Sequence, residues 1–125
     1  YSIGARQDLE LVYEALERLK EKKFVKGAIL HSDQGVQFTN SGYQMRVKEM
    51  GLTPSMSRKG NCWDNACIEN FFSHFKCEIG CFFENAESAF EVQNAASQYI
   101  HYFNHNRINT KLQTSPVKYL MRSAG

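Results

Sequence analysis

Amphipathic stretches alternate with short apolar runs along the first half of this 125-residue chain. Apolar residues recur at three- and four-residue spacing in the amphipathic stretches, as in helices that cover a core, whereas the apolar runs have the length of strands. Asp8 precedes the first stretch as a helix cap would, and Gly51 ends the second. The expected elements are a helix over residues 8–22, a strand over 28–31, a helix over 41–50 and a strand over 52–56. This alternation predicts an α/β fold.

The second half of the chain is richer in helix signals. Residues 57–63 read as a mobile loop with two adjacent cations, and Asp64 fits the N-cap of a helix that carries Glu69. Another long helix is expected over residues 86–104, and Pro54 places the second strand at a sheet edge because proline cannot donate to a ladder. The apolar stripe of the Glu69 helix, expected to face the sheet, consists of Ile68, Phe72, Phe75 and Ile79.

Two carboxylates beside these elements are the strongest functional signal. Asp33 follows a short apolar run and a turn signature, so it should project from the carboxyl end of a buried strand, and Glu69 lies one turn into a helix. Taken singly, an Asp after a strand, such as Asp33, is more often a turn residue, and a Glu on a helix, such as Glu69, is more often a solvated surface residue. Carboxylates on two rigid elements can instead share divalent metal ions, which a two-metal site holds about 3.5–4 Å apart for phosphodiester chemistry.

Six segments of the chain carry recognisable motifs: 31–38 (HSDQGVQF), 55–61 (SMSRKGN), 64–72 (DNACIENFF), 76–78 (KCE), 102–107 (YFNHNR) and 115–119 (SPVKY). Together they resemble bacterial insertion-sequence transposases with a retroviral-integrase-type catalytic core. That family uses an Asp, Asp, Glu triad, so Asp33 resembles the second acid and Glu69 the third. The resemblance implies metal-dependent cleavage and strand transfer of DNA, with Asp33 and Glu69 as ligands to Mg²⁺ or Mn²⁺.

The same resemblance implies a ribonuclease-H-like (integrase core) fold that lacks its first strands and has a helix-rich C-terminal half. The family's first aspartate lies upstream of the segment that residues 1–4 resemble, and Asp8 reads as a helix cap instead. We therefore expect residues 1–125 to form a partial catalytic core, with a basic tail over 104–125 packed on it. The strand that ends at His31 would have lost a neighbour, and an open edge of this kind predicts a homo-oligomer.

Charge distribution points to DNA as the partner. The net charge is only +2, but no Asp or Glu follows Glu91, so the last third of the chain is basic. For each single cation, a solvated surface position is about as plausible as a contact with DNA. Lys76 shares a helix face with Glu69 and stands nearest the expected metals. The candidate DNA contacts are Arg58, Lys59, Lys76, Arg107 and Lys111, and the candidates for positioning a phosphate are His31 and Asn65.

Other residue classes give weaker signals. The four cysteines lack the paired spacing of common zinc sites, so free thiols are favoured over structural zinc. His101 and His105 stand four apart without a third ligand nearby and are more typical of a surface than of a metal site. Neither a membrane-length apolar run nor a signal peptide pattern is present in the sequence, which favours a bacterial cytoplasmic protein.

Two non-catalytic roles remain open at this stage, together with one other catalytic role. The missing first aspartate and the basic tail would suit a catalytically inactive DNA-binding module, whose binding would depend steeply on salt. The chain could also be an oligomerisation piece of the transposase that binds neither DNA nor metal. A nuclease of the same fold class is a weaker alternative, which the products of the complete enzyme would distinguish.

Overall fold

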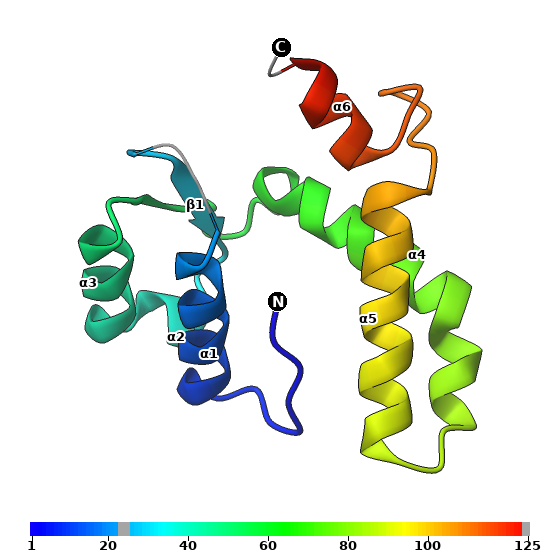
Figure 1. Ribbon diagram of the computed structural model, residues 1–125. Coiled ribbons are helices and arrows are strands. Elements are labelled where there is room, and N and C mark those ends of the chain that lie inside the picture. The colour runs from blue at the N-terminus through cyan, green and yellow to red at the C-terminus, as the bar shows by residue number, and fades with distance from the viewer. Residues whose placement is uncertain (23–25, 124–125) are drawn as a thin grey trace. The chain divides into compact units, whose positions relative to one another are not determined.

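The computed structural model describes residues 1–22 and 26–123, apart from the side chain of Cys62. The chain divides into two compact units, Tyr1–Glu69 and Asn70–Gly125, and each has a core of its own (Figure 1). Tyr1–Glu69 contains two short parallel strands and helices, whereas Asn70–Gly125 is helical. None of the helices in the described ranges is both long and apolar enough to cross a membrane.

The first unit contains the expected alternation of helix and strand. Its elements are α1 (Leu9–Lys20), β1 (Ile29–Ser32), α2 (Val36–Thr39), α3 (Ser41–Glu49) and β2 (Thr53–Met56). Asp8 caps α1 as predicted, because its carboxylate accepts a hydrogen bond from the Leu11 N–H at 3.0 Å. Gly51, with φ of +75°, ends α3 as predicted. The short helix α2 was not expected from the sequence.

The two strands pair in parallel, with Ile29 opposite Thr53 and Ser32 opposite Met56. Pro54 lies in β2, which has one neighbour in the described sheet, so its edge position is confirmed. The expectation that β1 is fully buried was wrong, because only one of its faces meets the core and Ile29 on the other is 71% exposed. A strand covered on a single face alternates buried and exposed positions.

The core of the first unit lies where α1, α3 and the strands meet. Its buried members are Leu16, Tyr43, Val47 and Leu52. Val12, Leu19 and Leu30 pack around them, so the predicted stripe of the first helix does face the core. Helices α1 and α3 approach each other closely at Gly42, where a Cβ would lie 2.6 Å from the Tyr13 hydroxyl. This packing fixes β1, from which the first candidate acid extends.

The entry into the helix that carries Glu69 differs from the prediction. A 3-10 helix, η1 (Cys62–Asn65), leads directly into α4 (Ala66–Glu84). Asp64 lies inside η1 and does not cap α4, because Arg58 occupies both of its carboxylate oxygens. Asn61 caps η1 instead, since its side chain accepts from the Trp63 N–H at 3.1 Å.

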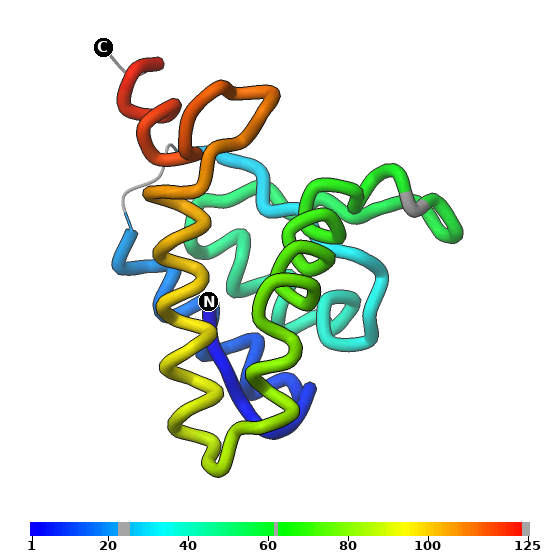
Figure 2. The backbone as a smooth tube through the Cα atoms, turned by 90° about the vertical axis from the view of Figure 1, so that its right-hand side faces the viewer, coloured from blue at the N-terminus to red at the C-terminus, as the bar shows by residue number. Residues whose placement is uncertain are grey.

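The second unit is held together by aromatic rings between α4 and α5 (Ala89–His105), two helices that run side by side in Figures 1 and 2. Phe71 lies 4.9 Å from Phe103 between ring centroids, and Phe75 lies 5.3 Å from Tyr99, both edge-to-face. The predicted stripe of α4 is therefore only partly right. Phe75 belongs to the packed face, but Ile68 and Phe72 are about half exposed, and Phe71 occupies the packed position instead.

The last helices also depart from the expected boundaries. Helix α5 begins three residues later than predicted, because Ser88 caps it by accepting from the Glu91 N–H at 3.2 Å. The stretch 104–125, expected as a tail, contains α6 (Pro116–Ser123), which contacts α5. A turn joins the two helices, closed by an antiparallel bridge between Asn109 and Thr114. Residues 124 and 125 of that stretch lie outside the described residues.

Candidate active site

Asp33 stands exposed directly after the last residue of β1. Its Oδ1 accepts a hydrogen bond from the Gly35 N–H at 2.7 Å, which orients the carboxylate in a turn. A Cβ on Gly35 would lie 2.9 Å from that same oxygen, closer than such contacts normally occur. Glycine at position 35 therefore lets the backbone approach the carboxylate while Oδ2 remains available to a ligand.

The turn that carries Asp33 is tied to the segment after β2. Gln34 Nε2 donates to the Ser57 carbonyl at 3.1 Å, and the Ser57 N–H donates to the Ser32 carbonyl at 2.9 Å. On the exposed side of the strands, His31 Nδ1 lies 3.0 Å from Ser55 Oγ. That contact occupies one nitrogen of the imidazole and leaves Nε2 to reach outward, which suits the predicted role of His31 toward a phosphate.

Glu69 lies in the first turn of α4, as the sequence predicts, and its side chain is exposed. A helix favours negative charge in its first turn because its unpaired backbone N–H groups are there. Among the described residues Glu69 forms no ion pair, and Lys76 on the same helix is exposed as well. Asn65, the predicted phosphate ligand, is partly buried at the end of η1. The carboxylate of Glu69 is thus accessible to a cation.

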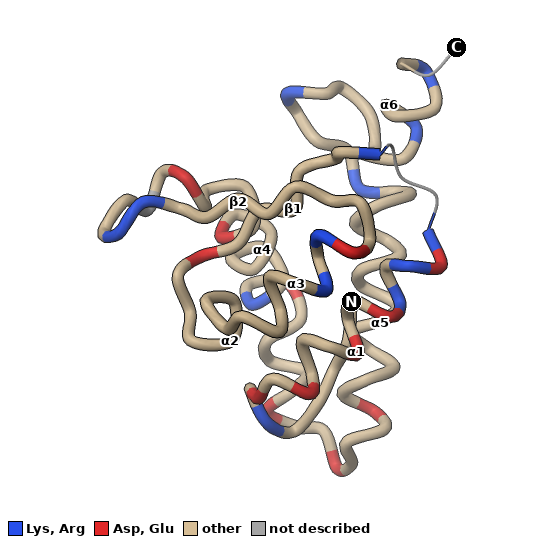
Figure 3. The backbone as a smooth tube through the Cα atoms, turned by 90° about the vertical axis from the view of Figure 1, so that its left-hand side faces the viewer, with Lys and Arg blue, Asp and Glu red and all other residues tan. Residues whose placement is uncertain are grey.

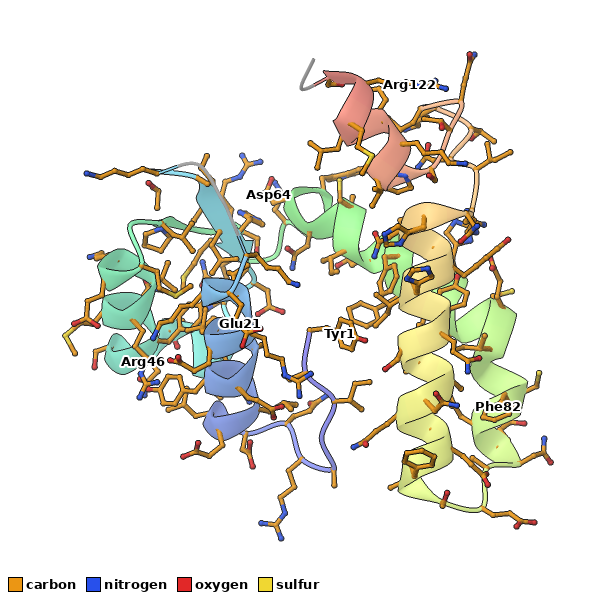
Figure 4. All side chains as sticks on the ribbon, in the orientation of Figure 1. Tyr1, Glu21, Arg46, Asp64, Phe82 and Arg122 are labelled. Carbon is orange, nitrogen blue, oxygen red and sulfur yellow. The ribbon has the colours of Figure 1, made fainter. Side chains whose placement is uncertain are left out.

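A charged clasp closes the loop between β2 and α4. Arg58 donates from its backbone N–H and Nε to Asp64 Oδ2 and from Nη2 to Oδ1, each at 3.0 Å. Figure 4 labels Asp64, which lies just before α4. These hydrogen bonds lower the pKa of Asp64 to about 2 and raise that of Arg58. Asp64 therefore stays ionised at neutral pH with both oxygens engaged, so the structure gives it a bracing role.

The donor set fits a hard divalent cation in kind, although not in number. Mg²⁺ and Mn²⁺ prefer carboxylate oxygens, and both Asp33 and Glu69 offer them from exposed positions. The described part of the chain contains no cluster of three or more acidic, histidine or cysteine side chains that could hold a metal. These two acids can therefore supply only part of a complete coordination shell.

Among the described residues, neither the cysteines nor the histidine pair belongs to a cluster that could hold a metal. Cys67, Cys77 and Cys81 are exposed free thiols, and the side chain of Cys62 lies outside the described residues. The His101 and His105 rings stack with centroids 4.2 Å apart, and the His105 ring contacts the His101 carbonyl through Nδ1. The stacking agrees with the predicted shared helix face.

The predicted DNA-contacting cations differ in how accessible they are. Lys59, Lys76 and Lys111 are exposed, and the Arg58 side chain is 76% exposed although it is paired. Arg107 is more enclosed, because its guanidinium donates to Glu78 Oε1 at 2.8 and 3.0 Å. Figure 3 shows the basic positions of the last third of the chain, where Lys and Arg occur without Asp or Glu.

The Arg107 and Glu78 pair belongs to a polar cluster that the sequence did not reveal. Arg107 also donates toward His74 Nδ1 at 3.2 Å, and burial together with the nearby Glu78 charge raises the pKa of Tyr99 to about 12. The two partners are separated by 29 residues in the chain, so spacing could not have joined them. Glu78 is engaged here and not near Glu69 on the helix, as its position nine residues further along predicts.

Comparison with known proteins places these features in context. Two family models match, both described as the integrase core domain, one over residues 1–62 and the other over residues 69–123. An uncharacterised transposase-like protein of Haemophilus influenzae is 42% identical over 119 residues, which is 94% of this chain and 52% of that protein. The putative transposase InsK of insertion element IS150 from Escherichia coli is 39% identical over 95% of this chain and 42% of its own length.

A third relative and a solved structure extend the comparison. The transposase of insertion element IS904 from Lactococcus lactis is 34% identical over 95% of this chain and 46% of its own length. The chain thus spans about half the length of these curated relatives. The crystal structure of the catalytic core domain of BIV integrase matches with a TM-score of 0.73 at 20% identity, covering 97% of this chain and 76% of that one. This likeness confirms the ribonuclease-H-like fold expected from the sequence.

Proposed function

The chain belongs to the family of bacterial insertion-sequence transposases with an integrase-type core, and from this premise we propose that it carries part of the site that cleaves and joins DNA during transposition. The observation that carries the proposal is the placement of two acids. Asp33 follows the end of β1 and Glu69 lies in the first turn of α4, and both are exposed. We assign them as the second and third acids from their resemblance to the family motifs.

In this proposal Asp33 and Glu69 hold a divalent cation, Mg²⁺ or Mn²⁺, that activates a hydroxyl nucleophile and stabilises the leaving phosphate oxygen. Gly35 holds Oδ1 of Asp33 through its N–H, so Oδ2 is the oxygen directed to the ligand. Two carboxylates supply only part of a coordination shell, so further ligands would complete the set. His31 and Asn65 orient the phosphate through their ring nitrogen and amide.

Exposed cations supply the rest of the proposed DNA interface. They neutralise backbone phosphates without reading the sequence, so binding should weaken steeply as salt increases. The enclosed position of Arg107 makes it the weakest of these contacts. DNA as the substrate in a bacterium also favours the cytoplasm as the location. The proposed contacts are Arg58, Lys59, Lys76, Lys111 and Arg107.

The test replaces each acid by its amide in a full-length transposase that contains this segment. With Asp33→Asn or Glu69→Gln, cleavage and strand transfer of labelled transposon-end DNA should fall by about 100-fold or more, because a metal ligand contributes several kcal/mol to the transition state. Glu84→Gln, at the far end of the same helix, is the matched control and should keep full activity. An active Glu69→Gln enzyme would refute the assignment.

A second candidate function follows from the number of ligands. Because the described residues contain no three-ligand metal cluster, the chain by itself suits an inactive module for DNA binding or oligomerisation. Crystals soaked in Mn²⁺ distinguish the two candidates by anomalous scattering. Density bridging Asp33 and Glu69 supports the catalytic role, whereas DNA binding without such density supports the inactive module.

A further inference from the structure

Trp63 is the only tryptophan in the chain, and its side chain is 84% exposed. An indole ring of this size contributes a large apolar surface when it is buried, so most folded chains cover it. Trp63 contributes to neither the core of the first unit nor the aromatic cluster of α4 and α5. Its position needs an explanation other than packing.

The backbone around Trp63 is braced from both sides. Its N–H donates to Asn61 Oδ1 at 3.1 Å, and the Asn61 N–H donates to the Arg58 carbonyl at 3.1 Å. The Arg58 and Asp64 clasp closes the loop at its base, and Gly60 turns the chain with φ of +75°. The indole is therefore presented from a short closed loop, and ordering it on a ligand costs less entropy than ordering a long open loop.

The loop also presents two cations, although Asp64 balances the charge of Arg58. Lys59 is exposed and forms no ion pair among the described residues, and the Arg58 side chain remains 76% exposed beside its carboxylate. Cations next to an accessible aromatic face form the surface that binds single-stranded nucleic acid, where phosphates meet the cations and a base stacks on the ring.

The loop is linked to the turn of Asp33. Ser57, at the start of the loop, accepts from Gln34 and donates to Ser32, the residues on either side of Asp33. Hydrogen bonds thus join the loop to the turn that carries Asp33, within one unit.

We propose that Trp63 is a stacking platform for an unpaired DNA base near the reacting phosphodiester, with Lys59 on an adjacent phosphate. The inference rests on the proposed function, because it takes DNA as the substrate. It adds that the bound DNA has an unstacked nucleotide, since a base inside a duplex has both faces covered by its neighbours.

The single tryptophan makes the test direct. The intrinsic fluorescence of Trp63 is followed during titration with a short single-stranded oligonucleotide, and binding is measured separately by the anisotropy of a dye on the DNA. Quenching should accompany binding, and an oligonucleotide of the same length with abasic sites should bind without comparable quenching. A blank duplex should quench less than the single strand.

Variants give the second arm of the test. Trp63→Ala should raise Kd for the single strand by about 5- to 150-fold, and Trp63→Phe should recover most of the affinity. Phe90→Ala, which removes a comparably exposed ring at 75%, is the control and should leave Kd unchanged.

The possible failures are distinguishable. Binding by anisotropy with no quenching, equal quenching by abasic DNA, or an unchanged Kd for Trp63→Ala would overturn the stacking proposal and leave the proposed function intact. Absence of DNA binding would overturn both. Quenching that depends on protein concentration without DNA would assign Trp63 to a protein interface instead.

Discussion

Gly35 determines how the Asp33 carboxylate is held, although Gly35 carries no side chain of its own. Its N–H fixes Asp33 Oδ1 at 2.7 Å, and a Cβ at position 35 would lie 2.9 Å from the same oxygen. The flexible carboxylate, and not the backbone, would have to move away from that Cβ. We therefore expect a very small change at this position to affect the orientation of Asp33, the proposed metal ligand, more than the stability of the fold.

We predict that Gly35→Ala lowers the cleavage rate of the full-length transposase by about 10- to 100-fold, because displacement of a catalytic group by about 1 Å can cost that much. The free energy of unfolding should change by less than about 1 kcal/mol. Gly80→Ala is the control, since a Cβ there meets nothing within 4 Å, and it should leave the rate unchanged. Wild-type cleavage by Gly35→Ala would show that the turn does not hold Asp33 for the reaction.

At the level of elements, the connection between β2 and α4 shows what a sequence can and cannot predict. The cap at Asp8, the stop at Gly51 and the first-turn position of Glu69 depend on residues within a few positions of one another, and all three predictions are confirmed. Asp64 also satisfied the local rule for a cap. Its carboxylate instead binds Arg58, six residues away in the chain. The 3-10 helix η1 therefore precedes α4, and Asp64 lies inside η1.

The second unit illustrates the same limit. The helical periodicity of α4 predicted a stripe, but which rings it packs depends on α5, whose Tyr99 and Phe103 select Phe71 and Phe75. Arg107 was predicted as a DNA contact from its charge alone, and the structure pairs it with Glu78 across 29 residues. The family motifs identified the fold, and they predict a role for both acids that stays a prediction. Contacts between distant residues could be found only in three dimensions.

The Arg58 and Asp64 clasp predicts a pH dependence for the loop between β2 and α4. Because the folded state lowers the pKa of Asp64 from 3.8 to about 2, the clasp is fully formed above about pH 4 and its contribution is lost as the pH falls from there toward 2. An NMR titration of the side-chain carboxyl carbon measures that pKa. In Arg58→Ala the pKa should rise from about 2 toward 3.8 but stay below it, because the backbone N–H of residue 58 still donates to Asp64 Oδ2.

The control for the clasp is Arg18→Ala, which removes a different exposed ion pair, that with Glu14, and should leave the pKa of Asp64 near 2. An Asp64 that already titrates near 3.8 in the unmodified chain would show that the clasp does not form in solution. The titration also tests the bracing on which the exposed position of Trp63 depends.

At the scale of the whole molecule, the sheet is the least complete feature. In the described residues it consists of β1 and β2 alone, and Ile29 on β1 is 71% exposed. Two strands are fewer than an independent sheet usually needs, and the backbone groups along an open edge can pair with another chain. The homo-oligomer expected from the sequence therefore stays a prediction with a structural basis.

We predict that the 125-residue chain self-associates at micromolar concentration through the open edge of β1. Sedimentation velocity should show a dimer or larger species, and Ile29→Lys should shift the population toward monomer, because a charged residue on an edge strand opposes pairing with a second strand. Met45→Lys, which adds the same charge at a 59% exposed position on α3, should leave the association unchanged. If the unmodified chain sediments as a compact monomer, the backbone groups along the edge of β1 do not pair with a second chain. The predicted self-association through β1 would then be wrong. Equal dissociation by both lysine variants would attribute the association to general charge and not to the strand edge.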